Sequence, residues 1–351
     1  MRPSTLLLVG VLAAVVATAV PLPAQTPAPS IATMSPITLR YNDFGPLRRE
    51  IIQPVHWWAE ELEKRTGGKV KVQFHGSSEL GKATEQIDNV QNRVFELALH
   101  CWGFQAGKTP LTMVTTLPFV SNDVVAMGKA AFDLFEVPEV KAELERLNLL
   151  AVAPAPTLSY QLLSRKPVTS VGDLKGLKVR SIGYQAKALQ RLGAVPVALP
   201  TSEMYVAMER GVVDAALWVI QGELDAYGFT GVTKYAVEVD AGALAPCAVI
   251  MNRQVYRDLP ADAQKMMREL ALQTPGLYKE VYRKGREKDE KALGARGVKI
   301  TRLPDAELTK IAEIAGPPVW KEWEAETNQK GLPGTKILNF WLDKVRQHEG
   351  K

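Results

Sequence analysis

The sequence predicts an α/β protein built of two lobes, and three observations support this fold class. Short apolar segments alternate with segments of helical period over residues 37–101, and the same alternation restarts at residue 149. A mostly helical and highly charged region follows residue 252. Because parallel strands need crossover connections, each alternating series predicts a parallel sheet covered by helices.

The first series contains three strands and two helices. It begins with a strand at 37–41 and ends with a strand at 94–101. Between them lies a strand with Val70, Val72 and Phe74 on one face. The two helices that separate the strands have one apolar face each, formed by Ile51, Val55, Trp58 and Leu62 in the first and by Ala83, Ile87 and Val90 in the second. The intervening sequences NDFGP, TGG and HGSSELG are typical of turns and helix ends. A further strand at 247–252 leaves the second series, and we expect residues 37–148 and 246–273 to form the first lobe.

The second series, residues 149–245, predicts the second lobe. It contains strands at 149–153, 159–164, 178–181, 195–199 and 213–218, a short helical turn at 171–174, and helices at 184–192 and 201–210. Thr201 can cap its helix, and Glu203 lies in the first turn, where an acid is favourable. The last region, residues 274–351, is rich in predicted helices, and we expect it to bridge both lobes.

The first residues predict export. Arg2 precedes an uncharged stretch whose apolar core runs from Leu6 to Val20, and small residues surround Ala24. This pattern is typical of a secretory signal peptide, and the apolar run is short for a membrane-spanning helix. We therefore expect a signal peptide at 1–24 cleaved near Ala24, a flexible leader at 25–36, and a periplasmic location. An uncleaved membrane anchor is the alternative.

Composition and motifs argue against several classes of function. The net charge of +5 is small and the basic residues are interleaved with acids, as in RKGREKDEK (283–291), so nucleic-acid binding is not expected. The histidines and cysteines show no metal-ligand spacing, so neither a metal nor a cofactor is expected. The sequence contains no GxSxG or HExxH motif, and we do not expect an enzyme. Two lobes favour a binding protein whose ligand occupies the crevice between them.

Six segments carry motifs that together point to one protein family. They are TGGKVKVQFHGSSELGK (66–82), TLPFV (116–120), GDLKGLKVRSIG (172–183), GAVPVALPTSEMYVAMERGVVDAA (193–216), APCAVIMNRQVYRDLPADAQKMM (245–267) and PVWKEW (318–323). Their order and spacing resemble the solute receptors of tripartite ATP-independent periplasmic (TRAP) transporters, of the C4-dicarboxylate-receptor type. The resemblance implies a periplasmic-binding-protein-like fold with hinge strands and a long bridging helix. It also implies a small organic carboxylate as ligand and membrane permease subunits as partners.

The resemblance further implies ligand-binding residues. In that family an arginine closing the GLKxR strand pairs with the ligand carboxylate, and the matching residue is Arg180. A guanidinium can donate two parallel charge-assisted hydrogen bonds to one carboxylate, whereas the ammonium group of lysine cannot. Trp218 and Tyr160 stand where sugar-acid receptors carry an asparagine and a second arginine, so a sugar acid is not expected. Some members hold a cation with a carboxylate beside this tryptophan, but Leu217 and Val219 flank it here, so no metal is expected.

Other pocket candidates and other functions stay open at this level. Asn42, Phe44 and Trp102 are predicted to line the pocket only because they follow strand ends. The ligand could be a short 2-oxo acid, a dicarboxylate or an aromatic acid. Alternatives to TRAP transport are a receptor for a sensor kinase, the receptor of an ATP-driven transporter, or an exported hydrolase.

The two cysteines lie far apart in the sequence. Cys101 ends the third predicted strand, and Cys247 begins the strand that returns from the second lobe. In binding proteins of this kind the returning strand runs antiparallel beside the third strand, so we expect the two residues to be neighbours. Bridging needs Cα atoms within ~7 Å and converging Cβ vectors, which adjacent strands often fail to provide. We therefore expect proximity without a disulfide, although an oxidising compartment would permit one.

Overall fold

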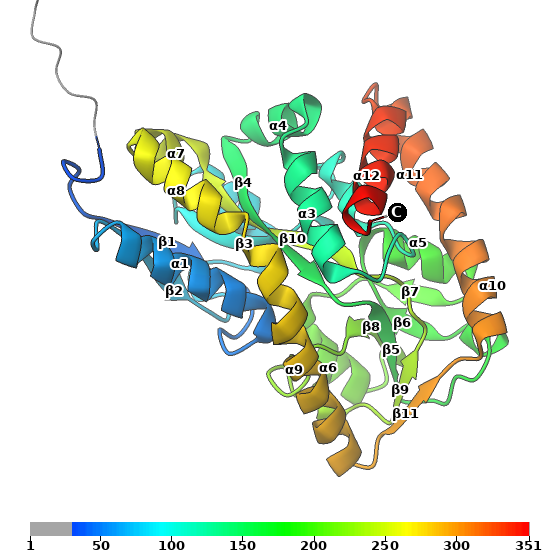
Figure 1. Cartoon of the computed structure of the whole chain (residues 1–351). Coiled ribbons are helices and arrows are strands. Elements are labelled where there is room, and N and C mark those ends of the chain that lie inside the picture. The colour runs from blue at the N-terminus through cyan, green and yellow to red at the C-terminus, as the bar shows by residue number, and fades with distance from the viewer. Residues whose placement is uncertain (1–29, 351) are drawn as a thin grey trace, which may run out of the picture.

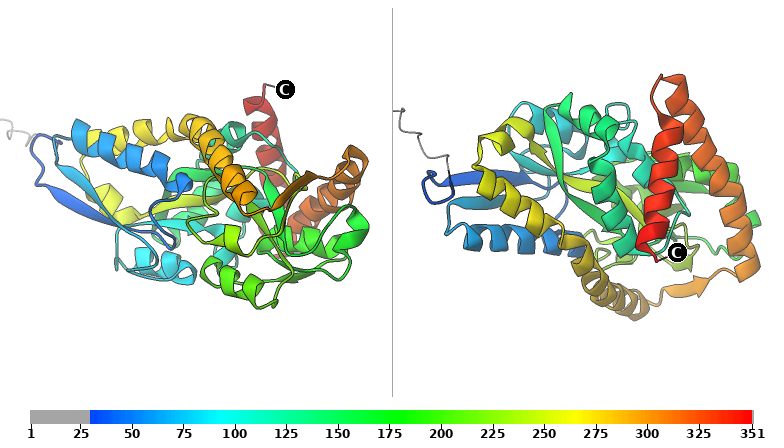
Figure 2. Two further views of the ribbon diagram at one scale, coloured as in Figure 1. Left: turned by 90° about the horizontal axis from the view of Figure 1, so that it is seen from below. Right: turned by 45° about the horizontal axis from the view of Figure 1, so that its top comes forward.

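The computed structural model describes residues 30–350, which form two β-sheets flanked by helices (Figures 1 and 2). The predicted signal peptide at 1–24 and the beginning of the predicted leader lie outside the described residues. Within residues 30–350, none of the helices combines the length and the apolar character needed to cross a membrane. The α/β fold class predicted from the sequence is confirmed.

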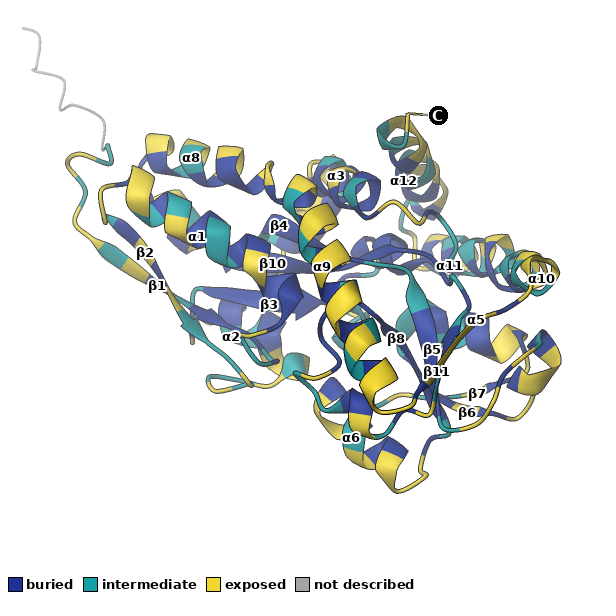
Figure 3. Ribbon diagram, turned by 60° about the horizontal axis from the view of Figure 1, so that its bottom comes forward, coloured by how far each residue is buried: buried dark blue, intermediate teal, exposed yellow. Residues whose placement is uncertain are grey.

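The first sheet has the strand order β2-β1-β3-β10-β4. Its strands are β1 (Ile37–Asn42), β2 (Val70–His75), β3 (Leu97–Cys101), β4 (Leu149–Thr157) and β10 (Leu244–Asn252). β1 is parallel to β2 and β3, whereas β10 runs antiparallel to β3 and β4. The helices packed against it are α1 (Gln53–Arg65), α2 (Gln86–Gln91), α3 (Val124–Phe135), α4 (Pro138–Glu145), α7 (Arg253–Asp258) and α8 (Ala261–Ala271). Strands β3, β4 and β10 are almost wholly buried, whereas β1 and β2 at the other edge of the sheet also carry exposed and half-buried residues, as Figure 3 shows.

The second sheet has the order β11-β9-β5-β8-β6-β7. Its strands are β5 (Tyr160–Ser164), β6 (Lys178–Arg180), β7 (Val195–Val197), β8 (Ala215–Val219), β9 (Tyr235–Glu238) and β11 (Lys299–Arg302), and its adjacent helices are α5 (Gly183–Arg191) and α6 (Thr201–Glu209). β6, β7 and β8 are parallel, and β5 runs antiparallel to β8 and β9. Strand β11 was not predicted, because all four of its residues are exposed and it shows no buried face to detect.

The position of β4 differs from the prediction. The sequence placed residues 149–153 in the second lobe, but β4 pairs with β10 at the edge of the first sheet and continues to Thr157. The sequence did not predict the second half of this strand because it contains Pro154 and Pro156, and proline has no N–H to donate to a neighbouring strand. An edge strand tolerates both prolines, since one of its sides has no partner strand. The chain therefore passes between the sheets at residues 158–159 and returns at residues 239–243.

The C-terminal region contacts both lobes. Its helices are α9 (Thr274–Ala295), α10 (Asp305–Ala315), α11 (Pro317–Gln329) and α12 (Gly334–His348). Helix α9 packs against α1 and α3 of the first lobe and leads directly into β11 of the second (Figure 1). Helices α10 and α11 pack against α5, whereas α12 lies beside α3. The last helices thus span from the second lobe back to the first.

The two cysteines are bonded. Strand β10 pairs with β3 in a register that sets Cys247 directly opposite Cys101, so their predicted proximity is confirmed. The expectation that they would stay unbonded was wrong, because the two residues form a disulfide. Direct cross-strand partners bring their Cβ atoms close together, and this pair meets the geometric requirement that many adjacent strands fail.

Candidate ligand-binding site

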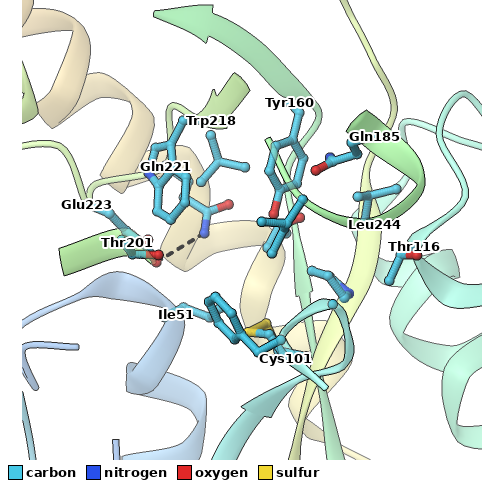
Figure 4. Close-up of a pocket in the computed structure, with 18 of the residues that line it drawn as sticks. Ile51, Cys101, Thr116, Tyr160, Gln185, Thr201, Trp218, Gln221, Glu223 and Leu244 are labelled. Atoms are coloured by element: carbon cyan, nitrogen blue, oxygen red, sulfur yellow. Dashed lines mark hydrogen bonds between the residues drawn. A yellow bond between two sulfur atoms is a disulfide. The ribbon is translucent and has the colours of Figure 1, made fainter. Parts of the chain in front are cut away.

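A cavity of about 60 Å³ lies between the two sheets, where the crossing connections meet the strand ends. It is lined by residues from both lobes: Phe44, Arg49, Ile51, Cys101, Gly103, Phe104, Thr116, Thr157, Tyr160, Arg180, Ile182, Gly183, Gln185, Thr201, Trp218, Val219, Gln221, Glu223, Leu244, Pro246 and Cys247. Figure 4 shows the labelled side chains surrounding one space. Apolar and aromatic residues make up most of this lining, which is typical of a site for a small organic ligand.

Arg180 closes strand β6 and is buried in the cavity wall, with 2% of its surface exposed. Its Nε and Nη2 atoms donate to the backbone oxygen of Leu199 at 3.0 and 2.9 Å. Within residues 30–350, no Asp or Glu side chain forms an ion pair with it, and burial lowers its pKa to about 10. A buried cation without a counter-charge is costly, so this arrangement favours an anionic ligand.

Aromatic rings form much of the remaining wall. The Arg180 guanidinium carbon lies 5.2 Å from the centroid of the Trp218 ring, which itself packs edge-on against Tyr227 and Phe229. Burial raises the pKa of Tyr160 to about 12, so this phenol stays neutral at physiological pH. The indole Nε1 of Trp218 is buried and has no hydrogen-bond partner within residues 30–350. The wall therefore offers flat apolar surfaces next to a cation and a free donor.

The structure brings four of the six predicted site residues together. Arg180, Trp218, Tyr160 and Phe44 line the cavity.

Asn42 and Trp102 do not line this cavity, so the structure does not place them where the sequence predicted. The Asn42 amide is fully buried and donates to Gly81 and Gln86, which fixes the turn after β2. Trp102 packs edge-on against Phe135 in the core of the first lobe. Position after a strand end could not reveal which way these side chains point.

Several cavity residues were not predicted from the sequence. Arg49 is buried, pairs with Asp43 and lies between the rings of Phe44 and Tyr227, at 5.4 and 5.6 Å from their centroids. Nothing in the sequence distinguishes Arg49 from the adjacent Arg48, which is more exposed. The sequence also gave no sign of three further polar residues in the lining, Gln185, Gln221 and Glu223. They share the cavity with residues of the other lobe, and no local sequence pattern records how two lobes pack. All three follow or lie close to strand ends, but so do many other polar residues, and this signal alone could not have selected them.

The lobes touch each other around the cavity. Arg48 of the first lobe donates to the backbone oxygen of Ala226 in the second at 3.0 Å. At Gly103 a Cβ atom would lie 3.1 Å from the Ile182 side chain, so this glycine permits a close approach of the lobes. The two lobes are therefore in direct contact beside the cavity.

Comparison with known proteins identifies the family. The profile of the family described as bacterial extracellular solute-binding protein, family 7, matches residues 46–327. The chain belongs to this family. The predicted resemblance to TRAP solute receptors is thereby confirmed.

Individual relatives are distant but cover most of the chain. The outer membrane transporter protein TsaT of Comamonas testosteroni is 25% identical over 303 residues, covering 85% of this chain and 87% of its own. A solute-binding protein of Verminephrobacter eiseniae is 29% identical over 219 residues, covering 62% and 64%. The structure of a TRAP solute-binding protein from Rhodoferax ferrireducens, in complex with copurified benzoate, is 24% identical with a TM-score of 0.80. It covers 90% of this chain and 99% of its own, so the fold is shared over nearly its whole length.

In this family-7 receptor the long helix holds one wall of the site. The carboxylate of Asp289 in α9 accepts hydrogen bonds from the backbone of Gly222 at 2.6 Å and of Leu224 at 3.2 Å. At Gly285 a Cβ atom would lie 2.0 Å from the backbone oxygen of Gln221, so only glycine allows the helix to pass here. The loop after β8 is thus fixed to the helix that spans both lobes. No group of three metal-ligating side chains occurs anywhere in the described part of the chain.

The buried Asp289 should make stability depend on pH. Burial raises the pKa of Asp289 to about 7, far above the value of about 4 in an unfolded chain. Between these values Asp289 binds more protons in the folded than in the unfolded state, so its contribution to stability falls as pH rises from about 4 to about 7. Chemical denaturation at pH 4.5 and 7.5 measures how far the free energy of unfolding changes between these two pH values. We expect Asp289→Asn to remove a fall of on the order of 2 kcal/mol from this change.

The asparagine side chain has only one oxygen, so the variant also loses one of the two hydrogen bonds that Asp289 accepts. This loss lowers stability at every pH, and the test therefore compares the pH dependence of stability and not its absolute value. Asp305→Asn, at an exposed position in α10, is the matched control and should keep the wild-type pH dependence. Equal slopes for wild type and Asp289→Asn would contradict the assignment.

Proposed function

We propose that this receptor captures a small aromatic monocarboxylate between its lobes and delivers it to the permease subunits of a TRAP transporter. The observation that carries the proposal is Arg180, a buried cation that has no acidic partner within residues 30–350 and lies in a mostly apolar cavity. In this proposal the signal peptide at 1–24 directs export, and the receptor works in the periplasm.

Hydrogen-bond donors near Arg180 support an acceptor-rich ligand group. The Gln185 Nε2 and Trp218 Nε1 atoms are buried, and neither has a hydrogen-bond partner among the described residues. Both side chains line the same cavity as Arg180. A carboxylate offers about four acceptor positions and can satisfy a guanidinium and further donors together. We propose Arg180 as the anchor for the carboxylate, with the other two donors as accessory contacts.

The walls support an aromatic body for the ligand. Trp218, Tyr160 and Phe44 present ring surfaces, and Phe104 lies against Phe44 with their centroids 5.5 Å apart. Flat rings gain from offset or edge-on contacts with such surfaces beyond simple burial of area. The Rhodoferax ferrireducens relative that shares this fold was obtained with benzoate. A sugar acid would leave many hydroxyl groups without partners against these rings.

A titration series of acids and their esters tests the proposal. Isothermal calorimetry should show that benzoate binds and that methyl benzoate binds at least about 100-fold more weakly, since the ester has no charge for Arg180. Pyruvate and succinate should bind more weakly than benzoate, because they leave the aromatic wall uncovered. Equal binding of ester and acid would refute the carboxylate site, and a preference for succinate would refute the aromatic one.

A further inference from the structure

The cavity also contains one acidic side chain, Glu223, on the loop after β8. Glu223 is 3% exposed, and its one hydrogen-bonded side-chain partner within residues 30–350 is Gln221, whose Nε2 atom donates at 3.2 Å. Figure 4 shows this pair on one side of the cavity, with Gln185 on the opposite side and Tyr160 between them. Glu223 does not form an ion pair with Arg180, so its carboxylate is available to a ligand.

The orientation of Glu223 is fixed by a short chain of hydrogen bonds. The Gln221 Oε1 atom accepts from the backbone N–H of Leu158, at the point where the chain passes between the lobes, at 2.9 Å. This contact commits the Gln221 amide nitrogen to Glu223. The backbone on either side of Glu223 is held by Asp289 of α9. A side chain positioned in this way can discriminate between ligands, because it cannot swing away from a poor one.

The surroundings of Glu223 supply charge but few donors. Arg49 lies close enough to influence Glu223, yet its guanidinium is committed to Asp43 and to the backbone oxygen of Pro46. Burial raises the pKa of Glu223 above its ordinary value, and the positive charge of Arg49 opposes that shift. A buried acid with a single donor is under-satisfied, and a donor on the ligand would relieve this cost.

We propose that Glu223, positioned by Gln221, selects aromatic acids that carry a hydrogen-bond donor, such as a hydroxyl group, on the ring. This inference rests on the proposed function and adds a second polar contact to it. Arg180 would hold the carboxylate and Glu223 would accept a hydrogen bond from the ring hydroxyl. The ligand class is then a ring-hydroxylated monocarboxylate rather than benzoate itself.

Pairs of ligands that differ only in this donor test the inference. Calorimetry with the 2-, 3- and 4-hydroxybenzoates and the corresponding methylbenzoates gives a hydroxyl-to-methyl affinity ratio for each ring position. For wild type we expect this ratio to reach about tenfold or more at one position, as for a hydrogen bond to a charged group. In Glu223→Gln the ratio at that position should fall to about threefold or less, and in Glu223→Leu it should favour the methyl compound.

The ratio is measured within one variant, so a general loss of affinity or stability does not affect it. Glu313→Gln, at an exposed position in α10, is the matched control and should keep the wild-type ratio. A Glu223→Gln ratio equal to that of wild type overturns the role of Glu223, as does a wild-type preference for methyl at every position. In both cases the proposed carboxylate site at Arg180 still stands if benzoate binds. If none of the acids binds, both the proposed function and the proposed role of Glu223 are refuted.

Discussion

Replacing Arg180 by lysine is expected to weaken carboxylate binding by about 2–3 kcal/mol, roughly 30- to 150-fold in the dissociation constant. Lysine keeps the positive charge but cannot make two parallel hydrogen bonds with a carboxylate. It also cannot reproduce the paired donation to the Leu199 backbone oxygen that holds the guanidinium in place. The Trp218 ring, against which the planar guanidinium lies, would lose its partner as well.

Calorimetry with benzoate measures this loss, and thermal unfolding shows whether the variant is folded. We expect the fold to persist, because Arg180 forms no ion pair with an acid in the described part of the chain. Arg210→Lys, at the exposed end of α6, is the matched control and should bind like wild type. If the Arg180→Lys receptor binds benzoate as tightly as wild type does, the carboxylate anchor lies elsewhere.

Removing the disulfide is expected to have the largest effect on stability. Cys101 and Cys247 are 146 residues apart, and closing a loop of this length contributes about 4–5 kcal/mol in the chain-entropy model. Replacing both residues by alanine should lower the midpoint of thermal unfolding by roughly 10 °C for a chain of this size. Because both residues also line the cavity, ligand affinity should fall at the same time.

Reduction provides the internal comparison for this experiment. A reductant such as a phosphine should lower the unfolding midpoint of the wild type toward that of the double alanine variant. The same treatment should leave the variant unchanged, since it has no cysteine left to reduce. A wild-type midpoint that does not respond to full reduction, checked by counting free thiols, would contradict the prediction.

The residues behind these two predictions, Arg180 and the cysteine pair, differ in how much the sequence predicted about them. The motif around Arg180 placed this residue at a strand end, and the structure puts it in the cavity wall. For the disulfide, the order of strands predicted that the cysteines would be neighbours, but not that they would be bonded. Bonding depends on which residue faces which across two strands, and a shift of one residue would have separated the two side chains.

The sequence by itself determined the α/β alternation, the family and the position of Arg180 at the end of a strand. These features depend on local periodicity and on short motifs, which a single chain segment carries. Only the tertiary structure decided the sheet to which β4 belongs, because an apolar strand does not specify its partner. It likewise turned Asn42 and Trp102 away from the cavity and brought Arg49 and Glu223 into it. The site lies between two lobes whose contacting residues are far apart in sequence, so its membership is set by how the lobes pack.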